Sequence, residues 1–112
     1  MESTSLNLLV DEHLRAAKEA SSGRSSFTIY GGHDQHLRQT LIAMSAGQTL
    51  DEHESPGEAT LQVLRGRVAL VTNGASTEGA EGDFLIIPAS RHSLDALADS
   101  AVLLTVAMAL GD

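Results

Sequence analysis

The stretch Gly47–Gly66 reads GQTLDEHESPGEATLQVLRG, and the later stretch Gly82–Ala96 reads GDFLIIPASRHSLDA. In both, short runs of apolar residues are interrupted by glycine, proline and serine, which is typical of strands joined by tight turns. Each stretch also holds one histidine, His53 in the first and His92 in the second. The two segments therefore predict short strands, with His53 near the end of one strand and His92 just before another.

The same pattern continues on either side of these segments, because from Phe27 onward apolar residues recur with a period of two. We predict eight strands, at Ser26–Tyr30, Leu37–Met44, Thr49–Glu54, Ala59–Arg65, Arg67–Thr72, Asp83–Pro88, Ser93–Ala96 and Val102–Met108. Asn73–Gly74 is the strongest hairpin signal between them. The intervals leave no room for crossover helices, so the sheets should be antiparallel and form a sandwich or a barrel.

The residues before the first strand predict one helix. Apolar residues from Leu6 to Ala17 recur on one face of a 3.6-residue period. Ser3, Thr4 or Ser5 can cap the start, and Gly23 suits the turn after the end. We expect a helical segment over residues 1–23 that packs on the barrel or on a dimer partner, and a barrel over residues 24–112. Because exposed strand edges and an apolar helix face need cover, we expect a homodimer.

Composition excludes several functional classes. The 112 residues include 7 Lys or Arg and 15 Asp or Glu, which gives a net charge of −8, and they include no Cys. Nucleic-acid partners are not expected, because phosphate binding needs clusters of basic residues. Association with an anionic membrane surface is not expected for the same reason, and no apolar run approaches the roughly 18 residues of a spanning helix. With no targeting signal in sight, we expect a cytoplasmic protein.

The two quoted stretches resemble the paired motifs of the cupin superfamily. Gly47, His53 and Gly66 stand in register with the first motif, and Gly82 and Pro88 with the second. His92 also matches if the loop after Pro88 is one residue shorter than usual. The resemblance covers roughly residues 37–108. It implies an RmlC-like jelly-roll, the double-stranded β-helix barrel, carrying here one N-terminal α-helix and usually assembled as a dimer.

The resemblance also implies where a metal would bind. Metal-binding cupins use three His and one Glu, and carried over to this chain the first and last His are His53 and His92. The second His position holds Ser55, the Glu position holds Ala59, and an Asn of the second motif falls on Ala96. Two of four ligands remain, whereas a transition-metal enzyme site normally needs three protein ligands. Glu58 can supply the third if the turn before it is irregular, so a divalent transition metal stays a possible cofactor.

The same positions define a candidate ligand site at the barrel mouth, composed of His53, Ser55, His92, Arg91 and Leu61. Two imidazoles facing each other there could act as acid and base, hydrogen-bond a ligand or hold a metal weakly. They could equally satisfy buried backbone groups and do nothing else. Arg91 could pair with a ligand carboxylate, or with Asp95 or Glu58.

Three functions remain open on this evidence. The first is a module that binds a small organic molecule beside a degenerate metal site. The second is a metal-dependent oxygenase, isomerase or lyase using His53 and His92 with a further ligand from Glu58, His36 or water. The third is an inert barrel that binds a protein partner. Because two ligand positions are substituted, we favour the binding module.

Overall fold

The computed structural model describes residues 1–53 and 57–108, together with the side chains in these ranges other than those of Glu52 and His53. One helix, α1 (Leu6–Glu19), precedes nine strands in the described chain. The strands are β1 (Arg24–Tyr30), β2 (Leu37–Met44), β3 (Thr49–His53), β4 (Gly57–Arg65), β5 (Arg67–Thr72), β6 (Ala75–Ala80), β7 (Phe84–Ile87), β8 (His92–Ala96) and β9 (Ser100–Met108).

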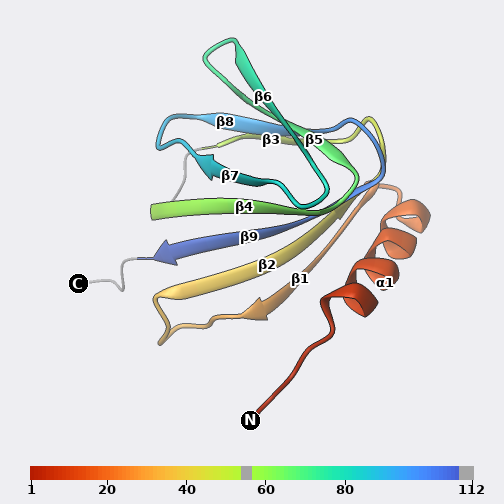
Figure 1. Cartoon of the computed structure of the whole chain (residues 1–112), viewed down its shortest axis with the longest axis vertical. Helices are drawn as coiled ribbons and strands as arrows, with labels where there is room; N and C mark the ends of the chain where they lie inside the picture. The colour runs from red at the N-terminus through yellow and green to blue at the C-terminus, as the bar shows by residue number, and fades with distance from the viewer. Residues whose placement is uncertain (54–56, 109–112) are drawn as a thin grey trace.

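The strands form two antiparallel sheets that face each other. The larger sheet has the order β1-β2-β9-β4-β7 and the smaller one the order β3-β8-β5-β6. The sheets converge near α1 and separate at the opposite end, where β2 and β4 begin and β9 ends (Figure 1). This is the antiparallel all-β architecture that the period-two pattern and the turn residues predicted, in the jelly-roll form that the resemblance implied.

All eight predicted strands are present, with ends shifted by at most two residues within the described chain. The predicted strand Thr49–Glu54 ends at His53, and Glu54 lies outside the described residues. The prediction omitted β6, which pairs with β5 through the Asn73–Gly74 turn. Nearly every residue of β6 is exposed, so this strand has no apolar alternation in its sequence. The turn itself has the positive φ angles of a tight hairpin, 50° at Asn73 and 77° at Gly74.

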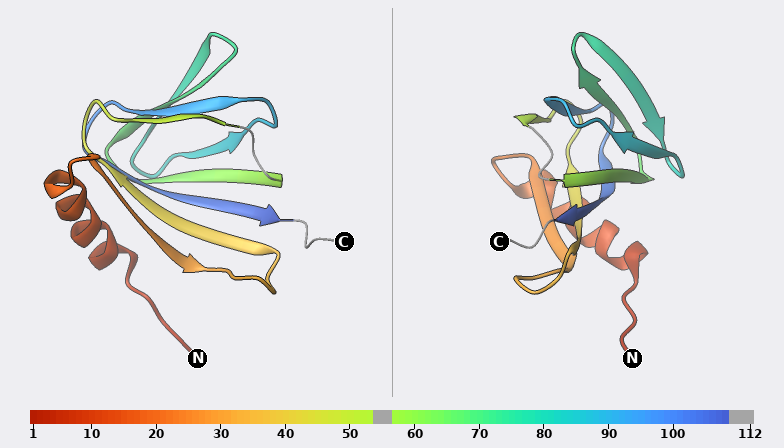
Figure 2. Two further views of the ribbon diagram at one scale, coloured as in Figure 1. Left: turned by 180° about the vertical axis from the view of Figure 1, so that it is seen from behind. Right: turned by 90° about the vertical axis from the view of Figure 1, so that its left-hand side faces the viewer.

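Helix α1 lies on the outer face of the larger sheet (Figure 2). The Ser5 side chain caps it by accepting a hydrogen bond from the backbone N–H of Leu8 at 3.2 Å. Val10 is buried against Leu41 of β2 and Ala101 of β9. The apolar face of the helix is therefore covered by its own sheet, and only the strand edges remain as a reason to expect a dimer.

The central strand of the larger sheet is β9, between β2 and β4. Its residues Ser100–Leu103 are all buried, so this half of the strand is covered on both faces, whereas Ala107 near its end is exposed. Within the described residues, no helix is both long enough and apolar enough to span a bilayer.

Candidate functional site

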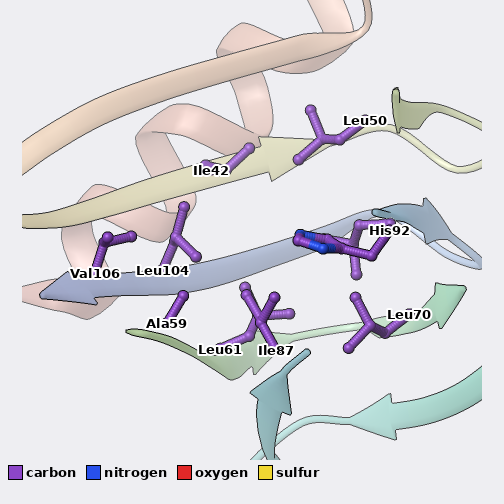
Figure 3. Close-up of a pocket in the computed structure, with 10 residues that line it drawn as sticks. Ile42, Leu50, Ala59, Leu61, Leu70, Ile87, His92, Leu104 and Val106 are labelled. Atoms are coloured by element: carbon purple, nitrogen blue, oxygen red, sulfur yellow. The ribbon is translucent and has the colours of Figure 1, made fainter. Parts of the chain in front are cut away.

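A cavity lies between the two sheets, toward their wide end. Its volume is about 50 Å³. Nine of the ten described residues that line it are apolar, and the tenth is His92: the set is Ile42, Leu50, Ala59, Leu61, Leu70, Ile87, His92, Leu94, Leu104 and Val106. The imidazole of His92 points into this apolar space (Figure 3).

Strand alternation explains why the cavity lies at this end. On the inner face of β4, Val63 belongs to the packed core, whereas Leu61 and Ala59 line the cavity. On β8 the inner residues run from Ala96 in the core through Leu94 to His92. The sheets diverge in the same direction, and the small side chain of Ala59 does not fill the gap. The interior is therefore closed by side chains near α1 and hollow near the wide end.

His92 is the polar group of this cavity among the described residues, and it is only 4% exposed. Its Nδ1 lies 3.0 Å from the carbonyl oxygen of Ser90. A carbonyl oxygen can only accept, so Nδ1 carries a proton and Nε2 is the acceptor nitrogen of the neutral ring. Backbone carbonyls orient histidines in the same way in many metal and catalytic sites. The site therefore contains one oriented imidazole ring in an otherwise apolar described wall.

Solved structures of other proteins share this architecture. An RmlC-like cupin protein from Desulfovibrio desulfuricans superposes with a TM-score of 0.73 at 24% identity, with 96% of each chain covered. The protein has the cupin fold. No family model matches the sequence, and no curated protein matches it either.

Two further solved structures share the fold. A conserved protein of unknown function from Streptococcus pyogenes has a TM-score of 0.71 at 27% identity, covering 80% of this chain and 78% of that one. A salicylate 1,2-dioxygenase from Pseudaminobacter salicylatoxidans has a TM-score of 0.74 at 20% identity, covering 89% of this chain but only 33% of the dioxygenase. At such identities these likenesses concern the fold alone.

Two of the predicted ligand-binding residues, His92 and Leu61, line the cavity of this cupin barrel. The backbone of His53 lies directly opposite that of His92 in the ladder between β3 and β8, after an irregularity that follows Leu50. Ser55 lies outside the described residues. The two histidines are thus brought together at the level of the backbone. The role of Ser55 in ligand binding stays a prediction.

The structure does not place Arg91 or Glu58 in the cavity wall. Arg91 is exposed, and its carbonyl oxygen accepts a hydrogen bond from the Thr72 hydroxyl at 2.8 Å. Glu58 is exposed near the start of β4, beside a groove on the outside of the sheet that also contains Phe84 and Ile86. Its neighbour Ala59 faces inward instead, because successive residues of a strand alternate between faces.

The remaining histidines also lie away from the cavity. His13 Nδ1 is 2.7 Å from the Ser25 hydroxyl on the helix side of the larger sheet. His33 is exposed in the loop before β2. His36 is exposed as well, and its Nδ1 lies 3.0 Å from the carbonyl oxygen of Met108. His36 therefore does not lean into the barrel as a supplementary ligand.

The described residues do not fit a transition-metal centre. Among them there is no group of three or more His, Cys, Asp or Glu side chains placed to hold a metal ion. The predicted set His53, His92 and Glu58 has one member in the cavity, one exposed on strand β4 and one whose side chain is not described. We therefore derive no reaction step through a metal.

The sequence interpretation missed most of the apolar cavity lining. Ile42, Leu50, Leu70, Ile87, Leu104 and Val106 were not selected as site residues, although all lie within predicted strands. The period-two alternation assigns each of them to one face of its strand. What it does not reveal is which inward positions meet around a cavity and which fill the core.

Proposed function

We propose that this protein is a binding module that holds a small, mainly apolar organic molecule, or the apolar part of one, inside its barrel, where His92 is the polar residue of the described wall. One observation carries the proposal, namely an apolar cavity with a single oriented, buried imidazole in its described wall. Ligand sites are typically apolar hollows with a few convergent polar groups that fix orientation. A cavity that served no ligand would gain stability by being filled with larger side chains.

The size of the cavity limits what can enter. A water needs about 10–15 Å³ of such volume, so about 50 Å³ accommodates three or four non-hydrogen atoms. That is the size of an isopropyl or isobutyl group. His92 is the polar residue of the described wall, and its Nδ1 is engaged by the carbonyl oxygen of Ser90.

A methyl NMR titration tests this proposal with two probes, xenon and 2-methylpropan-1-ol. Both should shift the methyl signals of Leu61, Leu104 and Val106 in a saturable manner. Ala59→Leu, which enlarges a cavity-wall side chain, should abolish both effects. Ala80→Leu adds the same atoms at an exposed position of β6 and should leave them intact. If neither probe shifts these methyl signals in the wild-type protein, the cavity does not bind ligands and the proposal is overturned.

A metal-dependent enzyme, an oxygenase, isomerase or lyase, is the second candidate. It is favoured by the protonated Nδ1 of His92, which directs Nε2 into the cavity as a potential ligand, and by the backbone pairing of His53 with His92. Elemental analysis of the purified, untagged protein separates the candidates. Near-stoichiometric iron, nickel, zinc or manganese that is lost in His53→Ala and His92→Ala would favour the enzyme over the simple binding module.

A further inference from the structure

The inner face of β2 continues beyond the cavity toward the wide end of the barrel. Met44 lies in the core, Ile42 lines the cavity, and Thr40 and Arg38 follow at the same two-residue spacing. Residues two apart in a strand share a face. Arg38 and Thr40 therefore project on the side of the sheet that encloses the cavity.

The pairing with β9 independently supports this placement. Arg38 lies opposite Val106, and Thr40 lies opposite Leu104. Both partners line the cavity, and residues directly opposite each other in an antiparallel ladder have neighbouring side chains on one face. Arg38 is thus placed at the rim, next to the outermost cavity residue of the larger sheet.

The charge of Arg38 stands apart from that of other basic residues. Lys18, Arg65 and Arg67 form ion pairs with acidic side chains, whereas Arg15, Arg24 and Arg38 form none with the described residues. Of these three, Arg15 and Arg24 are exposed, and Arg38 is half-buried. The chain has 15 acidic against 7 basic residues, so acidic partners are abundant. A partly buried guanidinium with no acidic partner in the described chain, beside an apolar cavity, suits an anion that arrives from outside.

We infer that Arg38 is a specificity-determining residue and that the ligand is a small branched carboxylate. This inference rests on the proposed function and adds the chemical class. The apolar part of the ligand occupies the cavity, and its carboxylate lies at the rim, where it accepts two parallel hydrogen bonds from the planar guanidinium. The Thr40 hydroxyl shares this face and can donate another.

A monocarboxylate fits better than a more highly charged anion. One guanidinium balances one negative charge, and the acidic surface of a chain with net charge −8 repels anions at long range. Recognition must therefore come from local hydrogen bonds. A tail of three or four carbon atoms matches a cavity of about 50 Å³.

The test compares 3-methylbutanoate with 3-methylbutanamide, which has the same shape but no charge. Affinities are measured by NMR titration for the wild type, Arg38→Gln, Arg38→Lys and Arg15→Gln. Arg15 is an exposed basic residue of α1, so Arg15→Gln makes the same change in net charge away from the barrel mouth. Loss of hydrogen bonds to a charged group predicts that Arg38→Gln binds the carboxylate about tenfold more weakly or worse. Arg38→Lys should be intermediate, and the amide should bind equally to all variants.

Three outcomes would overturn the inference. If the wild type binds the amide as tightly as the carboxylate, or Arg15→Gln weakens carboxylate binding as much as Arg38→Gln does, Arg38 does not select a carboxylate although the cavity still binds ligands. If neither compound nor xenon shifts the cavity methyl signals, the proposed function fails and the inference fails with it. The amide and xenon thus distinguish failure of the charge contact from failure of the cavity.

Discussion

The Nδ1 atom of His92 lies 3.0 Å from the carbonyl oxygen of Ser90, two residues earlier at the entrance to β8. This short-range contact fixes the proton on Nδ1 and directs the other nitrogen toward the cavity. The contact thus holds the imidazole in one orientation in the cavity wall, against which the apolar part of the proposed ligand would pack.

We therefore expect the neutral His92 ring to be the Nδ1–H tautomer. Long-range nitrogen–proton NMR correlations distinguish the two tautomers, and His33, which is exposed in a loop, serves as the internal reference. An Nε2–H tautomer at His92 would contradict the hydrogen bond from Nδ1 to the carbonyl oxygen of Ser90.

Sequence reasoning was most successful where local chemistry decides structure. A helix cap within the run Ser3–Ser5 and a hairpin turn at Asn73–Gly74 were predicted correctly, and the structure identifies Ser5 as the cap. Both act through local backbone geometry. The strand β6 was missed because it lies at a sheet edge with both faces largely exposed, which removes the alternation that marks a half-buried strand.

The site was predicted less completely than the fold. His92 was found from a motif, whereas Arg38 was not considered. Its inward direction depends on the pairing of β2 with β9, two strands far apart in the sequence. Arg91 was selected because it is next to His92, yet neighbouring residues of an extended chain point to opposite sides. Register and long-range pairing, which no local pattern encodes, decide these assignments.

Ser100 provides a stability prediction. Its side chain is buried, its oxygen accepts the backbone N–H of Arg67 at 3.1 Å, and its hydroxyl lies 2.7 Å from the carbonyl oxygen of Ala98. Ser100→Ala leaves these part-buried backbone groups without their partner, so the free energy of unfolding should fall by about 1 kcal/mol. Urea denaturation measures it. Ser76→Ala, at an exposed position of β6, should change the free energy little, and equal effects of the two substitutions would contradict the argument.

Asp99 provides a pH prediction. A hydrogen bond from the backbone N–H of Ala46 is the main cause that lowers the pKa of Asp99 below its ordinary 3.8, and Lys18 adds to it, while partial desolvation opposes the shift. Since the folded-state pKa is depressed, the contribution to stability is present above the unfolded-state pKa. It is lost as the pH falls through the folded-state pKa.

Carbon NMR titration of the Asp99 carboxyl group should therefore give a pKa below 3.8. In Lys18→Met the pKa should rise only in part, because the larger cause, the Ala46 hydrogen bond, remains. Full return to the ordinary value in that variant would assign the shift to Lys18 and contradict the hydrogen-bond explanation. Asp99→Asn should remove this component of the acid dependence of unfolding.

Oligomeric state is predicted from the sheet edges. The edge strand β7 carries Phe84, 62% exposed, and Ile86, 77% exposed. Unpaired edges with large apolar residues favour pairing with another copy. We expect light scattering to give twice the 11.7 kDa of one chain, and Ile86→Lys to shift the protein toward the monomer. Thr77→Lys introduces the same residue on the edge strand β6 and should leave the dimer unchanged. A monomeric wild type would contradict the prediction.

Ala59 allows a test of whether the cavity could hold a metal ion if it had one more metal-ligating side chain. Ala59 stands in the cavity wall with His92, at the position where metal-binding cupins have Glu, and His53 is paired with His92 through the backbone. Ala59→Glu would add an inward carboxylate to the two histidines, and three such ligands suffice for a divalent transition metal. Without metal, the buried carboxylate should destabilise the fold.

Nickel should therefore raise the melting temperature of Ala59→Glu and give saturable heat in calorimetry, because a metal that binds only the folded state stabilises it. Gln62→Glu is the matched control, since Gln62 lies on the same strand but is exposed on its outer face. If nickel has the same effect on both variants, the histidines do not converge with the inner face of β4. A nickel effect in Ala59→Glu but not in Gln62→Glu would show that the cavity can hold a metal ion once a carboxylate is supplied from the inner face of β4.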